Sequence, residues 1–100
     1  MPRPEIDHEL KVWPEYFAAI KRGDKPFEIR KDDRGYREGD ILLLREYYPG
    51  TDEYSGDELK ARVTFCIYGS NAMGFAFGIR AGFVAMGLAL SSHDRNPGEA

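Results

Sequence analysis

The stretch Gly-Asp-Lys-Pro-Phe-Glu-Ile-Arg at positions 23–30 decides how the rest of the chain is interpreted. It joins a glycine that can end a helix to a short run in which apolar and charged residues alternate. Because a β-strand has a period of two, we expect Phe27 and Ile29 to face the core. Glu28 and Arg30 then share the opposite face, where a carboxylate and a guanidinium can form a site.

A helix is predicted just before this stretch. Four apolar residues follow the i, i+3, i+4, i+7 spacing of an amphipathic helix, namely Trp13, Tyr16, Phe17 and Ile20. Pro14 suits the first turn, where its missing N–H costs nothing, and Gly23 suits the left-handed residue that ends a helix. We expect the aromatic stripe to be core and not a ligand site. The alternating run 8–12 predicts a short strand ahead of the helix.

Four strands are predicted after the helix, at 25–31, 40–47, 59–68 and 82–90. A polar turn at 32–39 and a hairpin loop at 49–57 separate the first three. A glycine-rich loop at 69–81, expected to be mobile, precedes the last. This order predicts a small, mainly antiparallel β-barrel with one N-terminal amphipathic helix, an α+β or mainly β fold.

Three of these strands have distinct burial patterns. In the strand 40–47, the residues on both faces are apolar from Ile41 until Arg45, so this strand is expected to be buried on both sides. The inward residues predicted for 59–68 are Leu59, Ala61, Val63, Phe65 and Ile67. Cys66 shares the outward face of that strand. The run 82–90 is apolar on both parities, and its glycines favour a core strand over a helix.

Composition limits the kind of protein. One hundred residues make one domain, and 42% apolar with 31% charged residues is typical of a globular chain. We expect a disordered lead-in at 1–7, one domain at 8–90 and a disordered tail at 91–100. The single cysteine excludes an internal disulfide, and no apolar run approaches the roughly 18 residues of a membrane span. A cytoplasmic protein without membrane contact is expected.

Charge is unevenly distributed. The formal net charge is −3, yet seven of the fourteen basic residues lie between positions 21 and 37, against four acidic ones. Such a locally basic segment is compatible with an anionic ligand, and equally with a solvated charged turn. No metal site or cofactor is expected, because His8 and His93 are far apart in sequence.

The motif residues resemble a known family. Gly23, Lys25, Glu28 and Arg30 fit the G-x-K-x-x-E-x-R pattern of ASCH domains, which belong to the PUA-like superfamily. Further matching segments are 8–11, 13–17, 27–31, 33–35, 39–40 and 54–56. Together they resemble ASCH-like proteins of unknown function found in bacteria and phages, over about residues 8–90.

The resemblance implies a PUA-like barrel whose motif lines a cleft beside the helix and binds RNA or a nucleotide. Activities reported in the wider superfamily are an amidohydrolase acting on acylated cytidine and a ribonuclease. In the amidohydrolase branch the catalytic lysine corresponds to Lys25, and a threonine nucleophile stands where this chain has Glu28. The resemblance therefore places the site better than it defines a reaction.

Three function classes follow. The preferred one is a binding module for RNA or a nucleotide, with ligand contacts from His8, Lys11, Lys25, Glu28, Arg30 and Arg34. The second is a hydrolase acting on a modified nucleoside or on RNA, with Lys25 and Glu28 as its catalytic proton-transfer pair. The third is an accessory protein that acts by protein contact through an exposed apolar loop at 69–81. For Lys25, Glu28 and Arg30, a purely structural ion pair is the alternative to a site.

Overall fold

One short helix and five strands succeed one another in the computed structural model, which describes residues 5–72 and 77–91. In chain order they are β1 (His8–Val12), α1 (Pro14–Lys21), β2 (Phe27–Lys31), β3 (Ile41–Tyr48), β4 (Glu53–Tyr68) and β5 (Phe83–Leu90). Each predicted strand is therefore present, although β4 is longer than expected. The predictions for residues 1–4, 73–76 and 92–100 lie outside the described residues.

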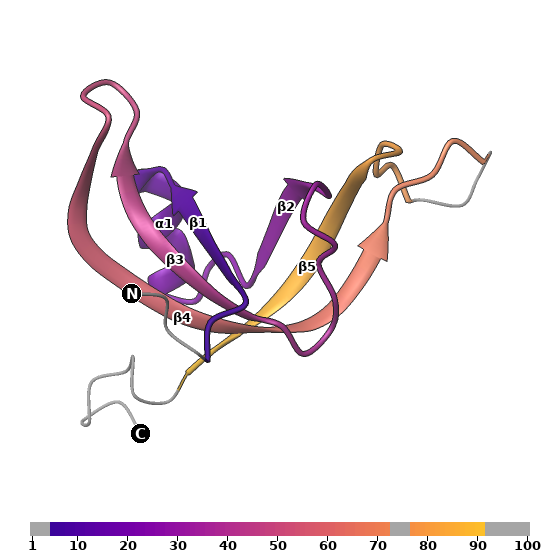
Figure 1. Cartoon of the computed structure of the whole chain (residues 1–100), viewed down its shortest axis with the longest axis horizontal. Helices are drawn as coiled ribbons and strands as arrows, with labels where there is room; N and C mark the ends of the chain where they lie inside the picture. The colour runs from indigo at the N-terminus through magenta and orange to yellow at the C-terminus, as the bar shows by residue number, and fades with distance from the viewer. Residues whose placement is uncertain (1–4, 73–76, 92–100) are drawn as a thin grey trace.

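The five strands form one sheet in the order β1-β3-β4-β5-β2. β1 runs parallel to β3, and the other three pairings are antiparallel. The sheet curls into a half-barrel, so that its two edge strands, β1 and β2, face each other across an opening (Figure 1). The predicted mainly β, mainly antiparallel architecture is confirmed. Among the described residues, no backbone pairing joins β1 to β2.

The long strand β4 makes the curl possible, because its first half pairs with β3 and its second half with β5. The pairing with β5 shifts register between Val63 and Phe65, which leaves Thr64 as an extra residue. This bulge reverses the alternation, so Phe65 is exposed and Cys66 is buried. The predicted inward Phe65 and outward Cys66 are therefore wrong, since an extra residue moves all later side chains to the other face.

The β3–β4 hairpin also differs from its prediction. β4 begins at Glu53, so the connection is a short turn at 49–52 and not a loop at 49–57. Tyr47 pairs with Tyr54 across the hairpin, with ring centroids 5.4 Å apart. The polar residues 55–57, which look like a turn in the sequence, lie where the register of the two strands is irregular.

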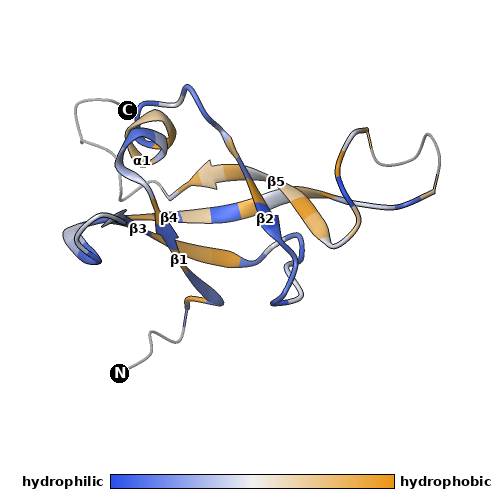
Figure 2. Cartoon of the chain, turned by 90° about the horizontal axis from the view of Figure 1, so that it is seen from above, coloured by the Kyte–Doolittle hydropathy of each residue, from blue (hydrophilic) through white to orange (hydrophobic). Residues whose placement is uncertain are grey.

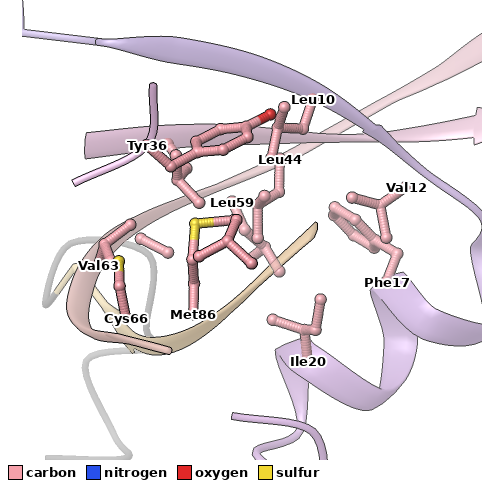
Figure 3. Close-up of a cluster of buried hydrophobic side chains, with 13 residues drawn as sticks. Leu10, Val12, Phe17, Ile20, Tyr36, Leu44, Leu59, Val63, Cys66 and Met86 are labelled. Carbon is pink, nitrogen blue, oxygen red and sulfur yellow. The ribbon is translucent and has the colours of Figure 1, made fainter. Parts of the chain in front are cut away.

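The core fills the concave side of the sheet (Figure 3). β3 is buried on both faces as predicted, with Leu42, Leu43 and Leu44 each at most 3% exposed. Tyr36, from the turn after β2, joins the same core cluster. In that turn, Asp32 accepts a hydrogen bond from the backbone N–H of Tyr36 at 3.1 Å.

The helix α1 packs against β3 and lies to one side of the sheet (Figure 2). Pro14 is its first residue, and Gly23 just beyond its end has φ +91°, as the sequence predicts. Phe17 and Ile20 are buried, whereas Trp13 and Tyr16 are 50% and 45% exposed. The prediction that the whole stripe is core is wrong, because Trp13 precedes the first helical turn and Tyr16 lies at its rim. The described helix is too short to cross a membrane.

Candidate functional site

In β2 the buried and exposed faces are exchanged relative to the prediction. Glu28 is buried and Arg30 is half-buried, whereas Phe27 and Ile29 are 45% and 50% exposed. The period of two is right, but the expectation that the apolar face lies in the core is wrong. β2 is an edge strand, so its inner face meets the opening of the half-barrel and its polar groups there.

Glu28 is at the centre of an ion-pair network. Its Oε1 lies 2.7 Å from Lys25 Nζ, and its Oε2 lies 2.7 Å from Arg30 Nε. The Glu28 side chain is only 8% exposed, and a carboxylate this buried is stable only when it is paired and hydrogen-bonded. The structural ion pair considered for these residues therefore exists.

Two arginines bridge the opening between β2 and β1. Arg30 Nη2 donates to the carbonyl oxygen of Lys11 at 2.5 Å, and Arg34 Nη1 donates to that of Glu9 at 2.7 Å. Both carbonyls belong to the edge strand β1, which pairs with β3 on one side and, among the described residues, has no hydrogen-bonded strand on the other. We call this line of contact, from Arg30 to Arg34 along β1, the seam.

A pocket of about 250 Å³ opens at one end of the seam. Its lining residues are Lys11, Val12, Trp13, Tyr16, Glu28 and Arg30. The rings of Trp13 and Tyr16 are stacked, with centroids 6.4 Å apart and an interplanar angle of 25°. Two half-exposed aromatic rings thus stand beside a buried carboxylate and a guanidinium. We call this the aromatic pocket.

A second pocket of about 310 Å³ lies further along the seam, and we call it the arginine pocket. Its lining residues are Glu9, Leu10, Lys11, Arg30, Arg34, Arg45 and Tyr54. Four cations and one carboxylate give this lining a formal charge of +3, in a chain whose net charge is −3. The two pockets share Lys11 and Arg30, so they adjoin.

The charges of the arginine pocket influence the pKa of the core residue Tyr36. Burial raises the pKa of Tyr36, while the nearby guanidinium groups of Arg34 and Arg30 act in the opposite direction. At the hairpin, the hydrogen bond to Asp52 raises the pKa of Tyr47. Both phenols therefore stay protonated at neutral pH.

The predicted site residues divide into two groups. Lys11, Glu28, Arg30 and Arg34 line one pocket or both. Lys25 and His8 line neither. Lys25 Nζ donates to Glu28 Oε1 and also to the carbonyl oxygen of Phe27, the latter at 2.9 Å.

His8 lies on the other face of β1 from Lys11. Its Nε2 is 2.9 Å from Asp40 Oδ2, and its ring packs edge-on against Tyr36 at 4.7 Å. His8 is thus satisfied by contacts away from the seam. Within the described part of the chain, no group of three histidine, cysteine or acidic side chains is placed to hold a metal ion.

The predicted site residues did not include several that line the pockets, among them Trp13, Tyr16 and Arg45. The first two were assigned to the core by their helical spacing. Arg45 reaches the site because β1 and β3 pair in parallel, which sets it beside Lys11. The pocket could have been predicted only from the exposure of the aromatic rings next to the motif. Helical spacing alone does not show whether a ring is exposed.

A separate apolar surface lies on the outward face of β2. It contains a pocket of about 290 Å³ lined by Ile29, Gly78, Ile79, Arg80 and Phe83. Phe77 in the adjoining loop is 86% exposed. A role in protein contact would require a surface of this kind.

The fold and the seam define a small, mainly β domain with a curled half-barrel sheet and a polar site at its open side. The chain belongs to the family described as "Domain of unknown function (DUF3850)", whose model matches residues 7–88. The match includes all residues that line the two seam pockets.

The chain is also similar to a phage protein. It is 40% identical over 57 residues to the "Uncharacterized 12.9 kDa protein in GpA 3'region" of Escherichia phage P2. The alignment covers 57% of this chain and 50% of the phage protein, so it spans about half of that relative's length.

Proposed function

We propose that the chain is an RNA- or nucleotide-binding module whose ligand lies along the seam. The observation that carries the proposal is the adjacency of the aromatic and arginine pockets, which share Lys11 and Arg30. A nucleotide joins a flat base to an anionic phosphate. Half-exposed rings stack on bases, and guanidinium groups bind phosphate with a fork of donors.

The phosphate belongs in the arginine pocket. Arg30 uses its Nε and one Nη in the contacts described above, and a guanidinium has five N–H donors. Arg34 likewise bonds Glu9 through one Nη. Both arginines are held in place by the protein and keep further donors, so little side-chain entropy is lost when an anion binds.

The base belongs in the aromatic pocket, against Trp13 and Tyr16. Glu28 contributes mainly by holding Arg30 in position. Each oxygen of Glu28 has one contact with a cation and retains acceptor capacity that an exocyclic amine of a base can use. The resemblance to ASCH domains of the PUA-like superfamily supports the same assignment, because the motif residues Glu28 and Arg30 line this pocket.

Binding can be measured through Trp13, the single tryptophan of the chain. Its ring lines the aromatic pocket and is half exposed, so a stacked base should quench its fluorescence. Titration with mononucleotides and short single-stranded RNA should give affinities that weaken steeply as salt is raised.

The matched pair of variants is Lys11→Ala and Lys31→Ala. The Lys11 side chain lines both pockets and its ammonium contacts only the Tyr47 ring among its described neighbours, whereas Lys31 is exposed on the outward face of β2. We expect about a fivefold to tenfold loss of affinity for the first and less than about twofold for the second. Arg30→Ala should also weaken binding. Equal affinities of the two lysine variants, or no binding by the wild type at low salt, would refute the proposal.

A hydrolase is the second candidate function, and the contact between Lys25 Nζ and Glu28 Oε1 favours it. At 2.7 Å these groups have the geometry of a proton-transfer pair. Because Lys25 lines neither pocket, its proton has to reach a substrate through Glu28. Acylated cytidines and short RNAs should be turned over by the wild type and not by Lys25→Ala. Absence of wild-type turnover, or equal turnover by both, removes this candidate.

A further inference from the structure

The β3–β4 hairpin adds a second group of aromatic rings on the side of the arginine pocket that β3 and β4 form. Tyr54 lines that pocket and is 41% exposed. Its ring lies against Tyr47, with centroids 5.4 Å apart, and under the guanidinium of Arg45, whose Cζ is 3.8 Å from the ring centroid. The hairpin projects beyond β1 (Figure 1).

Lys11 links the two aromatic groups. Its side chain lines the aromatic pocket of Trp13 and Tyr16, and its Nζ lies 4.6 Å from the centroid of the Tyr47 ring. Lys11 and Arg30 line both pockets and Arg45 lies over Tyr54, whereas Arg34 contacts Glu9 nearer the start of β1. Because β1 and β3 pair in parallel, Tyr47 follows the residue that lies beside Val12, so the second aromatic group lies at the same end of β1 as Trp13 and across that strand from it. Lys11 contacts both groups and lies between them.

We infer that the two adjoining pockets bind single-stranded nucleic acid of at least two nucleotides, with one base at each aromatic group and the linking phosphate between them. This inference rests on the proposed function. A lone nucleotide has one base and would leave one aromatic group unused. A duplex is unsuitable, because paired and stacked bases do not offer their faces to protein rings.

Arg45 contributes to the second base-binding position, beside Tyr54. Carboxylates of Glu9 and Glu58 lie 3.5 Å and 3.2 Å from its guanidinium, which holds the group in place over Tyr54. A planar guanidinium fixed in this way can itself stack on a base. The same contacts could serve only to stabilise the hairpin, so the test has to separate folding from binding.

The test uses adenosine monophosphate, the adenylate dinucleotide and tetranucleotide, and a short RNA duplex, with wild type and three variants. Wild type should bind the dinucleotide at least about fivefold more tightly than the monophosphate, and should bind the duplex most weakly. Tyr54→Ala should weaken the dinucleotide more than the monophosphate and so reduce this gain. Tyr54→Phe, which keeps the ring, should behave as wild type. Trp13→Ala lacks the fluorescent tryptophan, so its binding is measured by isothermal titration calorimetry, and it should bind all single-stranded ligands more weakly.

Each alternative result is decisive. If the monophosphate binds as tightly as the longer ligands, the single-strand inference is wrong and the proposed function stands. The inference also fails if the duplex binds equally well, or if Tyr54→Ala and Tyr54→Phe are equally impaired, which would indicate a structural role. If no ligand binds to the wild type, both the inference and the proposed function are wrong.

Discussion

Replacing Glu28 with glutamine tests whether one buried carboxylate holds the open side of the half-barrel together. Glutamine keeps the shape of the side chain but carries no charge. Its amide has only one acceptor oxygen, so either Lys25 or Arg30 faces an N–H group in place of an oxygen. The substitution therefore leaves two cations without their shared counter-charge.

The expected loss of stability follows from the burial of the three side chains. Removing one partner of a fully buried ion pair costs about 3–5 kcal/mol. Here the Lys25 and Arg30 side chains keep 19% and 27% exposure, and each also donates to a backbone carbonyl. We therefore expect a smaller loss, about 2–3 kcal/mol, equivalent to a fall in Tm of about 10–20 °C for a domain of this size.

Thermal unfolding followed by circular dichroism, with urea unfolding as a second measurement, checks this value. The control is Glu53→Gln, the same substitution at an exposed position of the hairpin, where we expect a change within about 0.5 kcal/mol. The difference between the two variants should persist in high salt, because buried charges are little screened. A loss below about 1 kcal/mol for Glu28→Gln would show that the pairs only balance the desolvation of the carboxylate.

Three further predictions concern the far half of the sheet. A Cβ added at Gly87 would lie 2.5 Å from Thr64 Oγ1, so Gly87→Ala should lower the free energy of unfolding by about 1–2 kcal/mol. Adding Thr64→Ala should restore most of the lost stability, measured by thermal unfolding. If the double variant is no more stable than Gly87→Ala, the assigned clash is wrong. A hydrogen bond with Cys66, and then desolvation, raise the pKa of Tyr68 from 10.0 to about 12, so this contribution to stability is complete below pH 10 and declines as the pH rises toward 12. Tyr68→Phe should reduce that decline in urea titrations at alkaline pH, and an unchanged decline would refute the assignment. Burial raises the pKa of the Cys66 thiol, so native protein should react with iodoacetamide much more slowly than protein in urea; equal rates would contradict the buried position.

Local sequence signals predicted the elements because each has a local cause. The end of α1 depends on a glycine with positive φ just after the C-cap residue Arg22, and Gly23 supplies it. β3 was predicted as a strand buried on both faces because three consecutive leucines place apolar side chains on both of its faces. Neither conclusion requires knowledge of which strands are neighbours.

The errors arise where burial depends on distant parts of the chain. The two faces of β2 cannot be assigned without knowing that it is an edge strand whose inner side meets the carbonyls of β1. The extra residue at Thr64 follows from the bend that lets β4 pair with both β3 and β5. In the same way, the motif predicted Glu28 and Arg30 as site residues, but helical spacing could not show that Trp13 is left exposed beside them.

In the part of the chain that the structure describes, the lack of backbone pairing between β1 and β2 leaves room for the two seam pockets. If the two edge strands were hydrogen-bonded, the carbonyls of Glu9 and Lys11 would accept backbone N–H groups and there would be no place for the guanidinium groups of Arg34 and Arg30. Since arginine side chains bridge the opening instead, both cations lie at the surface with unused donors and with an aromatic pocket next to them. A ligand that binds these donors would also strengthen the contact between the two edges, so binding at the seam should raise the stability of the whole domain with the logarithm of the ratio of ligand concentration to Kd.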